Sequence, residues 1–212
     1  MSPFNVPICM PRMSGHTAKV SPKSPITTAK ASPSAHRNRC GTAEIRPGPP
    51  RAVIASEDNR FCEHAGFDWV ELRHQVDRAW AGESTRGAST ITMQVAKNVL
   101  LWPGRDPVRK LFEAILTPQI ELFWNKRRII EVYLNVAETG IGTYGANAGA
   151  MRYFHHDASR LTRQEAARIA AVLPLPKERR AVTPRGFTRR YGNSISARMQ
   201  VVESDGLDSC LR

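Results

Sequence analysis

The chain has 212 residues, of which 41% are hydrophobic, and it carries a formal net charge of +12. This length suits one domain with a buried core plus an extension, and the composition is that of a soluble protein. No apolar run approaches the roughly 18–20 residues that cross a bilayer, and the N-terminus lacks the apolar core of a signal peptide. The charge favours polyanionic partners: nucleic acid, an anionic membrane surface or a phosphate-bearing substrate.

Residues 1–50 contain nine of the 15 prolines and seven basic residues against the single acid Glu44. Such a segment buries too little to offset the entropy of ordering, so a basic, disordered extension is expected there. Cysteines are scattered over the whole chain without a CxxC pair, so neither a zinc site nor a disulfide framework is expected. They are Cys9, Cys40, Cys62 and Cys210.

Helical patterning begins near residue 53 and continues along the chain. Large apolar residues at steps of three and four predict a helix over 69–80. A second helix is expected from 91 to about 101, ended by a Pro-Gly pair. A third follows Pro107, a favoured first-turn residue, and Pro118 is expected to kink or divide it.

The second half of the chain continues this pattern. A helix is expected over 126–138, followed by a glycine-rich loop over 139–150 in which positive φ angles are expected. Thr162 and Glu165 form a capping box for a helix that ends at Pro174. These elements predict a mainly α fold with one domain over about residues 51–200 and a tail over 201–212.

Two adjacent acids stand in the stretch "VIASEDNRFCEHAGFDW", residues 53–69. Taken alone, Glu57 and Asp58 are typical of a helix start, where acids lie near the positive end of the dipole. The apolar residues before Glu57 also allow a partly buried carboxyl group, whose pKa burial would raise into the range of a general base. The stretch alone leaves both interpretations open.

Two further stretches carry polar and basic groups. In "RGASTITMQVAKNVLLW", residues 86–102, the small residues permit close approach of a ligand and Lys97 supplies a point charge for phosphate. In "GRDPVRKLFEAIL", residues 104–116, Arg109 and Glu113 share a helical face. That pair is either a surface salt bridge or part of a cationic group that binds a diphosphate.

Two runs of large apolar residues end in tryptophan, at 100–102 and 122–124. Most of these side chains are expected in the core. An exposed subset would suit a membrane interface, where tryptophan is enriched.

Five stretches, taken together and in order, resemble the glycosyltransferase domain of peptidoglycan polymerases. They are similar above all to the monofunctional biosynthetic peptidoglycan transglycosylases, and they cover about residues 51–185. The stretches are "EDNRFCEHAG", "RGASTITMQ", "RKLFE", "KRRIIEVYLNVAETGIGTYGANAGAMRYF" and "LTRQEAARIAAVLPLP".

The resemblance implies a mainly helical, lysozyme-like fold with a small membrane-facing lobe. It implies polymerisation of lipid II with inversion and release of undecaprenyl diphosphate, at the periplasmic face of the bacterial inner membrane. The implied partners are lipid II, the growing lipid-linked glycan, the membrane surface and proteins of cell division or wall synthesis, with no nucleic acid. No cofactor is required, and Mg²⁺ or Mn²⁺ are the cations expected to stimulate; no compact set of metal ligands is expected.

The resemblance also assigns roles to residues. Glu57 matches the general base and Glu113 the second glutamate, which supports the diphosphate end. Asp58, Phe61, His64 and Gly66 shape the loop that holds the base. Substrate contacts and cations for the leaving diphosphate fall on Ser89, Gln94, Lys97, Arg105, Arg109 and Lys110.

The chain departs from the family pattern in two places. Met93 stands where the second motif usually has the first of two glutamines, so one amide partner for substrate is lost. Relatives carry a membrane-spanning helix before the catalytic domain, and no such run precedes residue 52. The alternatives are a lytic, muramidase-like enzyme, a truncated or inactive family member, and a basic nucleic-acid-binding protein, for which aromatic-basic interleaving and helix-turn-helix spacing are lacking.

Overall fold

The structure is a computed structural model that describes residues 47–84, 87–104 and 106–212. The predicted disordered extension falls almost wholly outside these residues, as does Arg105. The described residues form eight α-helices, two short strands and two 3-10 helices. In chain order they are α1 (Gly48–Glu57), α2 (Trp69–Trp80), α3 (Ile91–Leu100), α4 (Pro107–Phe123), α5 (Lys126–Val136), β1 (Glu138–Gly140), β2 (Thr143–Tyr144), α6 (Ala146–Phe154), η2 (Ala158–Arg160), α7 (Arg163–Val172), α8 (Gly186–Ser204) and η3 (Ser209–Leu211).

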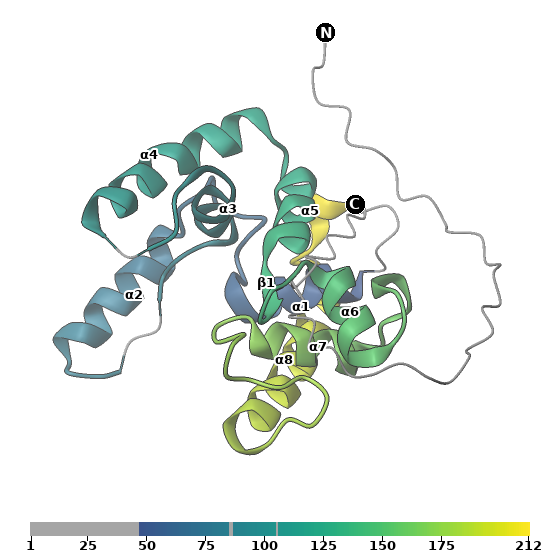
Figure 1. Cartoon of the computed structure of the whole chain (residues 1–212). Coiled ribbons are helices and arrows are strands. Elements are labelled where there is room, and N and C mark those ends of the chain that lie inside the picture. The colour runs from purple at the N-terminus through teal and green to yellow at the C-terminus, as the bar shows by residue number, and fades with distance from the viewer. Residues whose placement is uncertain (1–46, 85–86, 105) are drawn as a thin grey trace, which may run out of the picture.

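The helices fall into two groups, which Figure 1 shows on opposite sides of the molecule. We call α1 and α5–α8 the body, and α2–α4 the outer lobe. In the body, α1 packs against α7 and α8, and α7 packs along α8. Helix α3 packs against both α4 and α5, so it joins the outer lobe to the body.

Small residues allow the body helices to approach closely. Helix α7 buries four alanines, and a Cβ added at Gly192 of α8 would lie 3.7 Å from the Cβ of Ala171. Helix α8 has no counterpart among the predicted elements. Its buried positions, Gly192, Ile195, Met199 and Val202, recur at steps of three and four, which is the signal that would have predicted it.

Several local predictions are confirmed. Helix α2 has the predicted bounds, α3 and α5 begin where expected, and the capping box of Thr162 and Glu165 starts α7. Pro118 was expected to kink or divide its helix, and the structure shows that α4 is not divided there. The prediction of a loop over 139–150 is wrong, because this segment contains most of a two-stranded hairpin and the first half of α6. The turns are made by Gly142 and Gly145, whose φ angles are +65° and +93°.

The expectation of no disulfide is also wrong. Cys62 and Cys210 form a disulfide across a sequence separation of 148 residues. The expected tail takes part in the fold, because its first residues belong to α8 and Arg51 of α1 donates to the Asp208 carboxylate at 2.7 Å. The cysteine spacing could not show this pairing, since it depends on the C-terminus folding back beside the loop after α1.

The expectation that the two tryptophan-ended runs lie mostly in the core is wrong. Leu100 and Trp102 are exposed, and Leu122 and Phe123 are each 78% exposed. The apolar face of α2 also points outward, with Trp80 88% exposed. No helix within the described residues is long and apolar enough to cross a bilayer.

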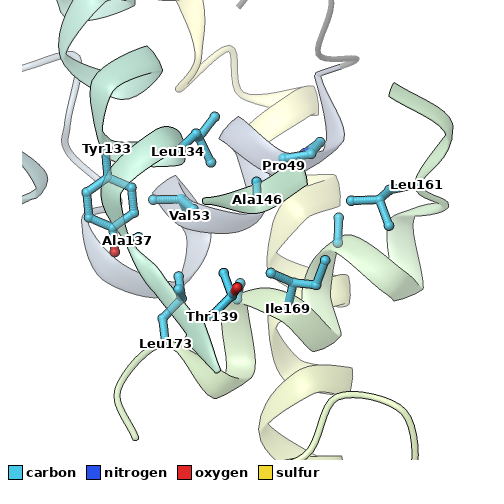
Figure 2. A pocket seen from close by; sticks show the side chains of 12 residues that line it. Pro49, Val53, Tyr133, Leu134, Ala137, Thr139, Ala146, Leu161, Ile169 and Leu173 are labelled. Carbon is cyan, nitrogen blue, oxygen red and sulfur yellow. The ribbon is translucent and has the colours of Figure 1, made fainter. Parts of the chain in front are cut away.

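The body contains a small apolar cavity of about 20 Å³ between α1, α5 and α7 (Figure 2). Val53, Tyr133, Ile169 and Leu173 are among its walls. A volume of this size holds about one water molecule, and its lining offers few polar partners. The cavity is therefore a packing gap in the core and not a substrate site.

Candidate active site

Glu57 is the last residue of α1, and Asp58 follows it as the C-cap. The interpretation of this acid pair as a helix start is therefore wrong, because the carboxylates lie at the negative end of the helix dipole. Burial raises the pKa of Glu57, while a hydrogen bond from Gln94 and the charge of Lys97 act in the opposite direction. The side chain is thus a partly buried acid with a pKa shifted towards the range of a general base.

Asp58 ties three segments together. One carboxylate oxygen lies 2.9 Å from His64 Nε2, and the other accepts a hydrogen bond from the backbone N–H of Ile91 at 3.0 Å. These contacts join the end of α1, the loop after it and the first residue of α3. Phe61 lies fully buried in the same loop, with the Lys126 ammonium 4.5 Å from its ring centroid. The loop that follows Glu57 is therefore held rigidly from both ends.

Gly66 is required where this loop meets the outer lobe. Its φ is +96°, and an added Cβ would lie 2.7 Å from Thr117 Cγ2 of α4. Its carbonyl accepts a hydrogen bond from the Thr90 hydroxyl at 2.6 Å, one residue before α3. The backbone of the loop thus fixes the positions of both α3 and α4 relative to Glu57.

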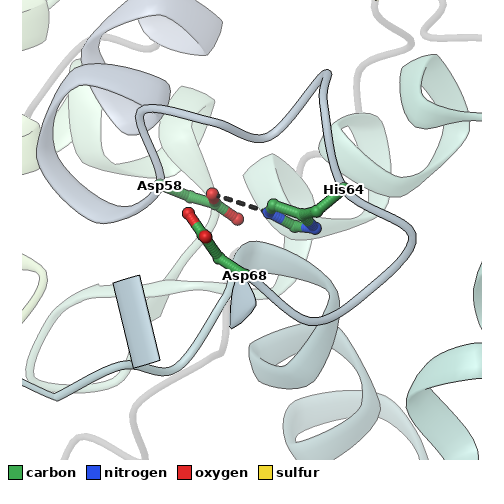
Figure 3. A group of neighbouring side chains, drawn as sticks. All are labelled: Asp58, His64 and Asp68. Carbon is green, nitrogen blue, oxygen red and sulfur yellow. Dashed lines mark hydrogen bonds and ion pairs between the residues drawn. The ribbon is translucent and has the colours of Figure 1, made fainter. Parts of the chain in front are cut away.

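Asp58, His64 and Asp68 lie close enough to suggest a metal site, contrary to the expectation of no compact ligand set (Figure 3). Their ligand atoms lie within 4.8 Å of one another. Both oxygens of Asp58 already accept hydrogen bonds, while Asp68 caps α2 and pairs with Arg60. A divalent cation would have to displace these partners and the Arg60 charge, so the residues fit a structural hydrogen-bond network and not a Mg²⁺ or Mn²⁺ site.

A cationic group lies on α3 and α4. Lys110 Nζ donates to Glu113 Oε1 at 2.6 Å and lies 3.5 Å from the Ser89 hydroxyl, so the three predicted residues are brought together. Glu113 is 2% exposed, and Arg109 is buried on the same helix. Glu113 forms its ion pair with Lys110, whereas the spacing of four residues had suggested Arg109 as the partner.

Lys97 of α3 lies within the electrostatic influence of both glutamates. Burial lowers the pKa of Lys97, and so do Arg109 and Lys110, while Glu113 and Glu57 act in the opposite direction. Lys97 therefore lies near two further cations, Arg109 and Lys110, and near the buried carboxylate of Glu113. Such a set attracts an anion and stabilises negative charge that develops on it. Met93, the departure from the second motif, is buried at the start of α3.

Two residues that act on Glu57, Tyr133 and Arg179, were not among the predicted site residues. Tyr133 of α5 donates to Gln94, which in turn donates to Glu57. Arg179 donates to the carbonyl of Ala171 at 2.8 Å, and its charge lowers the pKa of Glu57. Tyr133 stands in the fourth motif, so its position was visible in the sequence, but the irregular segment around Arg179 carries no periodic signal.

Residues 24–200 match the family model described as Transglycosylase. The chain is 46% identical over 168 residues to the biosynthetic peptidoglycan transglycosylase of Caulobacter vibrioides, an alignment that spans 79% of the chain and 73% of that relative. It is 45% identical over 191 residues to the protein of the same name from Rhodospirillum centenum, spanning 90% and 83% of the two. A biosynthetic peptidoglycan transglycosylase from Rhodopseudomonas palustris strain HaA2 is 48% identical over 170 residues, an alignment that spans 79% of the chain and 74% of that relative.

The match covers most of the chain, and the mainly helical fold agrees with it. The site geometry brings an acid with a raised pKa beside cations that suit a phosphorylated leaving group. The chain therefore belongs to the transglycosylase family and is a glycosyltransferase of peptidoglycan biosynthesis, as the five motifs predicted.

Proposed function

We propose that the chain polymerises lipid II into glycan strands, with Glu57 as the general base. The carboxylate removes the proton of the acceptor 4-hydroxyl as that oxygen attacks the anomeric carbon of the donor. The observation that carries this proposal is the partly buried Glu57, whose pKa burial raises, beside the cations of α3 and α4. Base and leaving group act on opposite faces of the sugar, so the configuration inverts without a covalent intermediate.

The cations take the place that a general acid has in a glycosidase. Lys97, Arg109 and Lys110 stabilise the charge that develops on the departing undecaprenyl diphosphate. Glu113 holds the Lys110 ammonium at 2.6 Å, which keeps the cation directed into the site. The Ser89 hydroxyl lies by the same ammonium and offers a further partner for the substrate. Arg105 is placed in this group by the family motif alone.

The outer lobe supports a position at a membrane. The relatives' name implies a function in the cell envelope, and lipid II is carried by a lipid. Trp80, Leu122 and Phe123 present large apolar side chains to the outside of the lobe that also carries the cations. We therefore place the outer lobe against the periplasmic face of the inner membrane, where a lipid-linked diphosphate enters at the level of the headgroups.

The base is tested with labelled lipid II and the Glu57→Gln variant. The amide keeps the size of the side chain but cannot accept the proton, so polymer formation is expected to fall by about 100-fold or more. Glu63→Gln is the matched control, because Glu63 is an exposed acid of the same loop that pairs only with Arg60 in the described contacts. This control is expected to retain normal polymerisation.

Two outcomes would overturn the proposal. Polymerisation that survives in Glu57→Gln would remove Glu57 as the base. Loss of turbidity from purified cell walls, without polymer from lipid II, would show a lytic muramidase-like enzyme in its place.

A further inference from the structure

Three side chains from three helices form a hydrogen-bonded chain that ends on Glu57. The Tyr133 hydroxyl of α5 donates to Gln94 Oε1 of α3 at 3.4 Å. Gln94 Nε2 donates to Glu57 Oε2 of α1 at 3.0 Å. Tyr133 is 1% exposed, and its ring lies on the wall of the body cavity (Figure 2). The chain therefore runs from the core of the body to the predicted base.

The polarity of this chain is set at its Glu57 end. An ionised carboxylate only accepts hydrogen bonds, so it requires the NH₂ side of the Gln94 amide. With the amide in that orientation, the Tyr133 phenol donates to the amide oxygen and so supports the same arrangement. Burial raises the pKa of Tyr133 well above its ordinary value, so the hydroxyl keeps its proton throughout the working range of pH.

We propose that Tyr133 is a positioning residue that acts through Gln94 to hold Glu57 in its ionised, proton-accepting form. The inference rests on the proposed role of Glu57 as the base. Gln94, which the family motif places among the substrate contacts, then has a second role as the link between Tyr133 and the base.

Other charged groups also act on Glu57 and would remain in a Tyr133 variant. The pKa of Glu57 is lowered by Lys97 of α3 and by Arg179 of the segment after α7, and it is raised by its neighbour Asp58. Tyr191 of α8 faces Tyr133 and raises the pKa of that phenol. Beyond Lys97 lie Arg109, Lys110 and Glu113 of α4. Because none of these groups depends on the Tyr133 hydroxyl, removing that hydroxyl tests the amide orientation alone.

Removing the hydroxyl frees the amide to turn. In Tyr133→Phe, a protonated Glu57 can donate to the amide oxygen of a reversed Gln94, which stabilises the neutral acid. The pKa of Glu57 is then expected to rise by about half a unit or more, because a hydrogen bond that favoured the charged form is replaced by one that favours the neutral form. The acidic limb of the profile of kcat/KM against pH is then expected to shift to higher pH, while kcat/KM at high pH is largely kept.

The experiment compares kcat/KM for lipid II across pH in the wild type, Tyr133→Phe and Tyr153→Phe. Tyr153 is the matched control, since it also loses a hydroxyl that donates internally, to the Thr139 carbonyl at 2.8 Å, far along the chain from Glu57. An acid limb shifted upward only in Tyr133→Phe supports the inference. An unmoved acid limb with a lower plateau, or an equal shift in Tyr153→Phe, overturns it.

A titration that needs no turnover separates this inference from the proposed function. Carbon-13 NMR of labelled glutamate carboxyls, with Glu57→Gln assigning the signal, reports the pKa of Glu57 directly. A wild type that makes no polymer refutes the proposed function, yet the carboxyl signal still tests Tyr133.

Gln94→Leu provides a second variant if Tyr133→Phe does not fold. As a single variant, Gln94→Leu should raise the pKa of Glu57, because it removes the amide that donates to the carboxylate. Where both variants fold, adding Tyr133→Phe to Gln94→Leu should raise the pKa no further, because the link is already broken. An unchanged pKa in Gln94→Leu, or additive shifts in the double variant, would overturn the inference.

Discussion

The body and the outer lobe use apolar residues in opposite ways. Helix α7 of the body buries small side chains, among them four alanines, against α1 and α8. Helices α2 and α4 of the outer lobe carry large side chains such as Trp80 and Phe123, and leave them exposed. Periodic apolar positions predicted the outer-lobe helices α2–α4 and, in the body, α5 and α7, but they did not predict what covers an apolar face.

The site lies where the two regions meet. Glu57 comes from the body, whereas Lys97 and Glu113 come from α3 and α4 of the outer lobe. In the proposed mechanism the two regions therefore contribute differently, because the body fixes Glu57 as the proposed base and the outer lobe supplies the charges for the lipid-linked diphosphate. Variants that change one region at a time test this difference between the body and the outer lobe.

The largest loss of stability is expected from a cavity in the body. Ile130 of α5 is fully buried, so Ile130→Ala should lower the free energy of unfolding by about 2–5 kcal/mol. Leu122→Ala is the counterpart in the outer lobe and should cost no more than about 0.5 kcal/mol, because its side chain is already exposed. Urea denaturation of both variants measures the difference. Equal losses would show that the Leu122 side chain contributes to a core.

The disulfide is expected to have the next largest effect, because it ties the loop after α1 to the C-terminal segment of the chain. The double variant Cys62→Ser, Cys210→Ser should lose about 2–4 kcal/mol, because the bond closes a loop of 148 residues in the unfolded chain. Thermal unfolding with and without a reducing agent measures it. Reduction should lower the midpoint of the wild type and leave that of the variant unchanged. A wild type that is insensitive to reduction would contradict the pairing.

The smallest effect on stability is expected at the exposed apolar face. Trp80→Ser combined with Phe123→Ser should change the free energy of unfolding by no more than about 0.5 kcal/mol per site. Binding to anionic phospholipid vesicles should nevertheless fall several-fold, as measured by co-sedimentation. Val182→Ser, at an exposed apolar residue between α7 and α8, is the control and should bind like the wild type. Unchanged binding in the double variant would remove the outer lobe as the membrane-facing surface.

Local signals predicted much of the fold. Helix α2, the start of α3 and the capping box at Thr162 follow from spacing and capping chemistry within a few residues. Helix α8 escaped prediction although its buried positions recur at steps of three and four. Pro118 was expected to kink or divide α4, and the helix is not divided there; its neighbour Thr117 packs against the glycine turn at Gly66.

Motif order and helical spacing are local properties of the chain, and they were enough to predict the family, the mainly helical class and the residues that carry acid, amide and cationic groups. Packing between distant segments explains why Glu57 ends a helix beside α3, why Lys110 pairs with Glu113, and why Cys62 meets Cys210. It also explains why Tyr133 reaches Glu57 through Gln94. Each of these depends on which helix faces which, and that choice is made by packing between residues far apart in the chain.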